Sequence, residues 1–124
     1  MFVKNLNACK EFTANDGCLI RELLHPKNDP VDLGWSMAVA SVCAGKRTLQ
    51  HKLVQSEVYY ILSGQGRMHI HNEACEVCAG DVVLIPPQAI QWIENTGDRE
   101  LQFIAIVSPP WREQDDHLCA QRKA

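Results

Sequence analysis

An alternation of apolar and polar residues with a period of two is the feature that most constrains the fold, and it dominates the chain from about residue 18 onward. Such a period places successive side chains on opposite faces of a β-strand, whereas an amphipathic helix needs a period near 3.6. Gly, Pro and Asn residues typical of turns separate the alternating stretches. We therefore predict an all-β protein. The predicted strands are residues 18–24, 35–43, 46–54, 57–62, 67–71, 74–78, 82–85, 89–94 and 100–107.

The predicted strands are short and close together, which favours a single sandwich or barrel, and 124 residues leave no room for a second domain. We expect an N-terminal extension at residues 1–17, a barrel at 18–108 and a polar C-terminal tail at 109–124. Residues 115–117, Asp-Asp-His, fall in this tail, so we expect them to be solvated rather than catalytic.

Charge and composition exclude several classes of partner. The chain has 12 Lys and Arg against 15 Asp and Glu, a net charge of −3, whereas a nucleic-acid-binding protein carries a basic patch. No apolar run reaches the ~20 residues of a membrane helix. The first residues lack the pattern of a signal peptide, so we expect a cytoplasmic protein whose six cysteines are reduced thiols.

Three polar side chains are candidates for one interior site. His51 and Leu53 share a face of the predicted strand 46–54, because every second residue of a strand points the same way. Glu57 opens the next strand, and a tight hairpin between the two strands would let His51 and Glu57 converge. Gln91, on a later strand, supplies a third group that can reach the same point.

The spacing of these residues resembles the two motifs of the cupin superfamily. The first motif reads here as Gly45, five residues, His51-Lys52-Leu53, three residues, Glu57, six residues and Gly64. The second reads as Gly80, five residues, Pro86-Pro87-Gln88, two residues, Gln91, three residues and Asn95. The resemblance implies a small single-domain cupin with a double-stranded β-helix, or jelly-roll, barrel. It also implies a homodimer.

The chain departs from the cupin pattern at two of the four expected metal ligands. Leu53 replaces the second His of the first motif, and Gln91 replaces the His of the second. The remaining set, His51, Glu57 and Gln91, could hold a divalent ion such as Zn, Mn, Fe, Co or Ni. In the alternative interpretation, His51 and Glu57 form a hydrogen-bonded pair without a metal. Iron oxygenase chemistry is disfavoured, because only one His remains.

Three further side chains are candidates for ligand contacts. Tyr59 lies on the face of Glu57 and either offers its hydroxyl to a ligand or packs with a buried hydrogen bond. Leu53 is expected to line the pocket. Arg47 shares the predicted face of His51 and either meets an anionic substrate at the barrel mouth or is solvated.

Two other clusters favour structural interpretations. His69 and His71 share a strand face with Arg67, which indicates a solvent-facing strand rather than a metal pair. Cys75 and Cys78 have the spacing of a zinc or redox motif, but no second pair accompanies them, and residues three apart on a strand point to opposite faces.

Two functions remain open at this point. The first is an isomerase-like or lyase-type enzyme acting on a sugar derivative or organic acid, with a divalent metal and with Glu57 or Tyr59 moving a proton. The second is a non-catalytic, metal-free cupin that binds or senses a small molecule.

Overall fold

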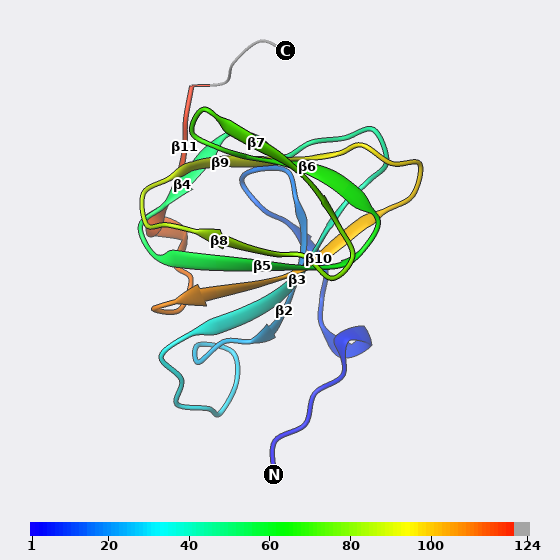
Figure 1. The fold of residues 1–124 in the computed structure, drawn as a ribbon. Helices are drawn as coiled ribbons and strands as arrows, with labels where there is room; N and C mark the ends of the chain where they lie inside the picture. Colours follow the sequence, from blue (N-terminus) through cyan, green and yellow to red (C-terminus); the bar gives the residue numbers. More distant parts are fainter. Residues whose placement is uncertain (121–124) are drawn as a thin grey trace.

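Two antiparallel sheets face each other in the computed structural model, which describes residues 1–120 (Figure 1). The strands are β1 (Phe12–Thr13), β2 (Leu19–Leu24), β3 (Ser36–Val42), β4 (His51–Leu53), β5 (Ser56–Ser63), β6 (Gln65–Ile70), β7 (Glu73–Cys78), β8 (Val82–Ile85), β9 (Ile90–Asn95), β10 (Leu101–Ser108) and β11 (Asp116–Leu118). Two short 3-10 helices, η1 (Leu6–Ala8) and η2 (Glu113–Asp115), flank the barrel. The all-β prediction is confirmed, and the architecture is a double-stranded β-helix.

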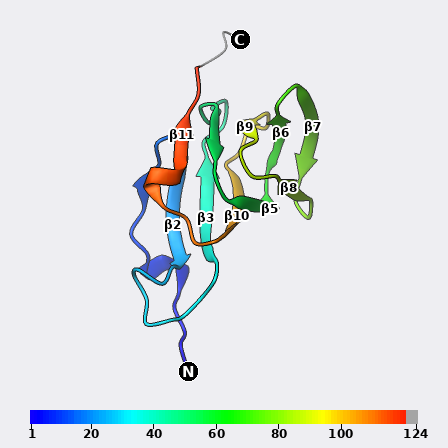
Figure 2. The ribbon, with the colours of Figure 1, turned by 90° about the vertical axis from the view of Figure 1, so that its left-hand side faces the viewer.

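After β3 the chain crosses between the two sheets at every connection except the β6–β7 hairpin, as in the jelly-roll pattern. The six-stranded sheet has the order β1-β2-β3-β10-β5-β8, and the five-stranded sheet has the order β11-β4-β9-β6-β7. Figure 2, a view from the side, shows β2 and β11 at one edge of the molecule and β6 and β7 at the other. Each of the predicted strands overlaps a strand of the structure, and β1 and β11 are additional.

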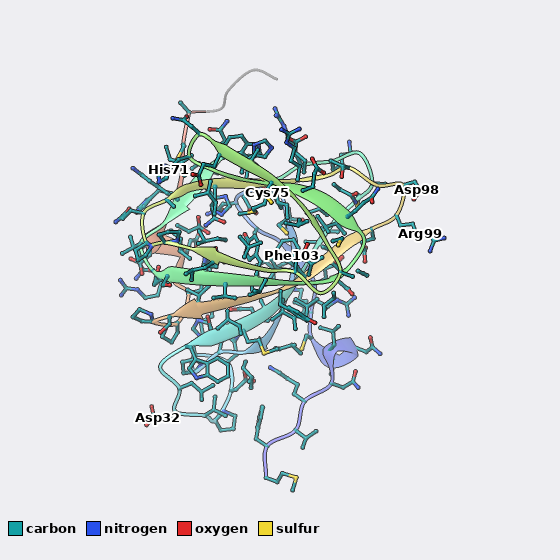
Figure 3. The ribbon with its side chains drawn as sticks, viewed as in Figure 1. Asp32, His71, Cys75, Asp98, Arg99 and Phe103 are labelled. Atoms are coloured by element: carbon teal, nitrogen blue, oxygen red, sulfur yellow. The ribbon has the colours of Figure 1, made fainter. Side chains whose placement is uncertain are left out.

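The core lies between the two sheets, where most of the inward side chains are apolar and buried. The largest fully buried apolar side chains are Phe103, Ile61, Ile85, Ile93 and Leu101. Figure 3 shows Phe103 between the layers, whereas Asp98 and Arg99 project outward from the turn before β10. The described residues contain no helix with the length and hydropathy of a membrane span.

The predicted strand 46–54 is interrupted, and the interruption changes which residues face inward. Only β4 is a regular strand there, while Arg47 makes an isolated bridge. Gln50 and His51 are consecutive and both buried, so the alternation changes phase between them. A shift of one residue exchanges the two faces of a strand. The prediction that Arg47 shares the face of His51 is therefore wrong, and the Arg47 side chain is exposed.

The segment expected to be a solvated tail instead extends a sheet. Strand β11 pairs antiparallel with β4, and the flanking backbone adds bonds from Val54 N to Asp115 O and from Cys119 N to Gln50 O. Without this partner, β4 would present an unpaired edge. Asp115 and Asp116 are partly buried, so the expectation of a solvated Asp-Asp-His is wrong for both carboxylates. Residues 121–124 of the expected tail lie outside the described residues.

Candidate active site

A small cavity of about 70 Å³ lies against the inner face of the six-stranded sheet. Apolar residues form most of its wall, and most of these come from β1, β2, β3 and β10. The polar residues of the wall include Asp16, Ser36, His51, Glu57, Tyr59 and Asp116. Polar and titratable groups therefore converge on one mostly apolar pocket, which is the usual form of a small-molecule site.

Glu57 and Gln91 are joined by a buried hydrogen bond between the two sheets. Gln91, on β9, is fully buried, and its Nε2 donates to Oε1 of Glu57, on β5, at 3.0 Å. The hydroxyl of Tyr59, also on β5, donates to Oε1 of Gln91 at 3.1 Å. The second carboxylate oxygen of Glu57, Oε2, makes no hydrogen bond to any residue in the described part of the chain. One oxygen of Glu57 is thus held in place while the other remains available to a ligand.

The environment of Glu57 changes its acidity. Burial disfavours the charged form and raises the pKa of Glu57 from 4.5 to about 7. The hydrogen bond from Gln91 and the nearby His51 oppose this rise, while the charges of Asp116 and Asp16 add to it. Burial also raises the pKa of Tyr59 well above 10, so its hydroxyl stays protonated.

His51 lies directly opposite Gln91 in the pairing of β4 with β9. Its Nδ1 lies 3.0 Å from the carbonyl oxygen of Leu49, which can only accept a hydrogen bond, so Nδ1 carries the proton. The same Nδ1 is 3.6 Å from Oδ2 of Asp16. In the neutral ring Nε2 then holds the lone pair. His51 therefore offers a basic nitrogen in a cavity that also contains a weakly acidic carboxyl.

Three carboxylates that sequence reasoning did not assign to the site also line the cavity, those of Asp16, Glu22 and Asp116. Asp16 follows β1, is 8% exposed, and accepts a hydrogen bond from the backbone N of Cys18 at 3.0 Å. Burial raises its pKa. Asp116, on β11, accepts from the indole Nε1 of Trp111 at 3.1 Å. The Asp16-Gly17 pair indicates only a turn, and no local pattern shows that either Asp points into a cavity.

The structure brings most of the sequence-predicted site residues together. His51, Leu53, Glu57 and Tyr59 line the cavity, and Gln91 contacts Glu57 and Tyr59 from behind it. Arg47 is not brought to the cavity. The phase change before His51 turns Arg47 outward, so it cannot meet a ligand there.

The donor set does not fit a divalent metal ion as it is arranged. Within residues 1–120 no group of three His, Cys, Asp or Glu side chains is placed to hold one ion. Leu53 has no donor atom, and the carbonyl oxygen of Gln91 already accepts from Tyr59. The Gln91 amide turns its N–H, rather than its oxygen, toward Glu57. The chemistry of the site is therefore derived from the side chains of His51, Glu57 and Tyr59.

The two other clusters lie outside the cavity. His69 stacks on Trp92 with ring centroids 4.2 Å apart, and its Nε2 lies 2.5 Å from Oε1 of Glu94. Cys75 and Cys78 are exposed free thiols. Figure 3 labels His71 and Cys75 at the five-stranded sheet, away from Phe103 in the interior.

Comparison with known proteins identifies relatives of this chain. The model of the Cupin domain family matches residues 41–107. An uncharacterized protein of Methanocaldococcus jannaschii is 42% identical over 110 residues, which cover 88% of this chain and 87% of that protein. The oxalate-binding protein of Thermotoga maritima is 39% identical over 51 residues, 41% of this chain and 42% of that protein.

Solved structures share the fold at lower identity. Pac13, a nucleoside dehydratase, superposes with a TM-score of 0.79 at 21% identity, covering 99% of this chain and 94% of that one. Streptomyces Pac13 has also been solved with uridine. The oxalate decarboxylase of Lactobacillus farciminis superposes with a TM-score of 0.78 at 24% identity, covering 90% of this chain and 34% of that chain.

Proposed function

This chain belongs to the cupin family, and from that premise we propose that it is an enzyme that isomerises or eliminates from a small molecule by acid–base catalysis. The observation that carries the proposal is Glu57. It lines the cavity, is 7% exposed, and has a pKa raised by burial to about 7. Perturbed carboxyls in clefts are candidates for proton transfer.

Glu57 is suited to donate and accept protons near neutral pH. With a pKa of about 7, its carboxyl is present in both forms at that pH. General acid–base catalysis is most efficient when the pKa of the catalytic group lies near the working pH. The bond from Gln91 fixes one oxygen of Glu57, and Tyr59 in turn holds Gln91. We assign Tyr59 a positioning role through Gln91, because its single O–H proton is donated to the Gln91 oxygen.

His51 supplies the complementary group. Its Nδ1–H is held by the carbonyl of Leu49, which leaves Nε2 as a proton acceptor. An imidazole base and a protonated carboxyl in one cavity can take a proton from carbon and return one to carbon or to a leaving hydroxyl. Isomerisation and elimination by proton transfer both use a base and an acid on one substrate.

The cavity favours a compact sugar derivative over an organic acid. Asp16, Glu57 and Asp116 line it, so a carboxylate substrate would meet charges of its own sign. The dehydratase and the decarboxylase that share the fold are 21% and 24% identical to this chain, and that likeness extends to the fold alone.

Proton exchange with solvent tests the proposal whatever the product of the reaction is. A panel of neutral and amino-substituted sugar derivatives is incubated with the protein in D2O, and loss of carbon-bound protons is followed by NMR. We expect exchange in at least one compound, and a fall of about 10²- to 10⁴-fold in the Glu57→Gln variant.

The matched control is Glu94→Gln, the same chemical change at a glutamate that pairs with His69 outside the cavity. This variant should keep the wild-type exchange rate. Equal exchange in Glu57→Gln and wild type would overturn the role of Glu57. Saturable binding without exchange of any compound would assign the chain to the non-catalytic class of ligand-binding cupins.

A further inference from the structure

The cavity is lined by more acidic side chains than basic ones. Four carboxylates line it, those of Asp16, Glu22, Glu57 and Asp116. Among residues 1–120, no Lys or Arg lines the same cavity, and His51 is the one lining side chain that can become cationic. Its Nδ1 lies 3.6 Å from Oδ2 of Asp16. A ligand is therefore the remaining source of positive charge.

One of the four carboxylates has its own partners. Oε1 of Glu22 accepts from Nδ2 of Asn28 at 3.2 Å and lies 3.7 Å from Nζ of Lys27. Lys27 is half-exposed, and its Nζ lies 5.4 Å from the ring centroid of Trp111. Glu22 and Lys27 compensate each other, which leaves Asp16, Glu57 and Asp116 as the uncompensated set.

Of the three remaining carboxylates, those of Asp16 and Glu57 are largely removed from water and that of Asp116 is partly buried. Asp16 and Glu57 are 8% and 7% exposed, and the charge of Asp116 disfavours ionisation of both. Burying like charges together is costly unless a counter-charge is present. Glu57 lines this space, and its Oε2 has no hydrogen bond to any of the described residues. It is a nearly buried acceptor that a ligand N–H would satisfy.

Aromatic rings form the other part of the wall. Phe12, Tyr59, Phe103 and Trp111 all line the cavity. The indole N–H of Trp111 donates to Oδ2 of Asp116, so a ring and a carboxylate are held beside each other. The faces of aromatic rings attract cations, and organic ammonium ions are bound by such walls.

The arrangement suits an organic cation better than a metal ion. In the part of the chain that the structure describes, no three acidic or imidazole side chains converge closely enough to hold one ion. A volume of about 70 Å³ has room for a few water-sized groups. We propose that the cavity binds the protonated amino group of a small organic ligand, such as an amino-substituted sugar derivative. This inference rests on the proposed function, because it names the substrate class of the same cavity.

Three probes of nearly equal size and different charge test the proposal. They are n-butylammonium, 1-butanol and butyrate, each titrated into the full chain at neutral pH. Binding is followed by ¹H–¹⁵N NMR, with the indole N–H of Trp111 as the reporter. We expect saturable binding of n-butylammonium at least about tenfold tighter than that of 1-butanol, and no saturable shift with butyrate.

A pair of Asp→Asn variants tests which carboxylate is responsible for the binding of n-butylammonium. Asp116→Asn should weaken n-butylammonium binding about tenfold and leave 1-butanol binding unchanged. Asp115→Asn is the control, since Asp115 is the neighbouring residue but bonds to Gln55 and Arg112 and does not line the cavity. Should Asp116→Asn disturb folding, as judged by its NMR spectrum, Asp16→Asn provides the second test with the same expectation.

Three results would overturn the inference. They are butyrate binding as tightly as n-butylammonium, an unchanged preference for the cation in both folded Asp→Asn variants, and saturable Zn²⁺ binding at the reporter without binding of the amine. Different results would show that the proposed catalytic function is wrong. Amine binding with no proton exchange on any compound would overturn the catalytic activity and leave the preference for a cationic ligand standing. Exchange of neutral compounds without amine binding would overturn the preference for a cationic ligand and leave the catalytic activity standing.

Discussion

At the scale of single residues, Glu57 couples the chemistry of the site to the stability of the protein. The ordinary pKa of its carboxyl is 4.5, and the pKa in the folded protein is about 7. Between these two values the folded state holds a proton that the unfolded chain has lost. The free energy of unfolding must therefore fall as pH rises through this window, and its Glu57 contribution is fully present only below about pH 4.5.

We predict a loss of about 3 kcal/mol from the Glu57 contribution between pH 4.5 and pH 8, because one pKa unit corresponds to about 1.4 kcal/mol. Glu57→Gln keeps an acceptor for the Gln91 N–H but cannot ionise. The variant should therefore gain that amount relative to wild type over the same range, as measured by urea unfolding at several pH values. The pKa of Asp16 is also raised, so Asp16 lowers the free energy of unfolding with rising pH equally in both proteins. A difference between the two proteins that does not vary with pH would refute the assignment.

Sequence reasoning could identify part of this site and not the rest. His51, Glu57 and Gln91 belong to spaced motifs whose distances along the chain are fixed by strand and turn lengths. Asp16 and Asp116 belong to no motif, since their positions depend on how segments a hundred residues apart pack together. The prediction for Arg47 is wrong because one extra buried residue before His51 reverses the alternation, and a hydrophobicity pattern does not reveal such a phase change.

At the scale of elements, β11 connects the C-terminal segment to the cavity. It pairs only with β4, and none of its three residues is buried. It nevertheless carries Asp116 opposite Leu53. Regular strands such as β5 and β10 were predictable because each has several alternating apolar residues. A polar strand of three residues carries no such pattern, and it forms because β4 offers an open edge.

We predict that His117→Pro detaches β11 while the barrel stays folded, because proline cannot donate a hydrogen bond within a ladder. Amide hydrogen exchange should become faster for Val54 and Cys119, whose N–H groups bond across β4 and the C-terminal segment. The amide of Phe103, in the core, should keep its protection. His117→Thr is the control, since threonine is compatible with a strand. Unchanged protection of Val54 and Cys119 in the proline variant would show that β11 does not depend on this pairing.

At the scale of the whole molecule, the cavity is completed from both ends of the chain. Asp16 comes from the segment expected to be an N-terminal extension, and Trp111 and Asp116 come from the segment expected to be a tail. The barrel at residues 18–108 alone would thus lack two of the three uncompensated carboxylates. The division into extension, barrel and tail describes where the alternation begins and ends, while the site spans all three parts.

The outer face of the six-stranded sheet carries exposed apolar side chains on its β5, β8 and β10 strands. On this face Val58 pairs with Leu84, and Tyr60 with Val82, across β5 and β8. Val82 and Leu84 are each 68% exposed. Ile106, on β10, continues the surface on the other side of β5. Contiguous exposed apolar surfaces of this kind mark interaction sites.

We propose that a second copy of the chain covers this outer face, in agreement with the homodimer expected from the cupin resemblance. An uncharged apolar surface is complementary to itself, which is what the twofold interface of a homodimer requires. We predict that Leu84→Lys, which places a charge at the middle of the surface, converts a dimer to a monomer in analytical ultracentrifugation. Leu118→Lys is the control, because Leu118 is 51% exposed on β11, away from this face, and should leave the dimer intact. A wild-type chain that sediments as a monomer at all concentrations, or equal dissociation by the two substitutions, would contradict the interface.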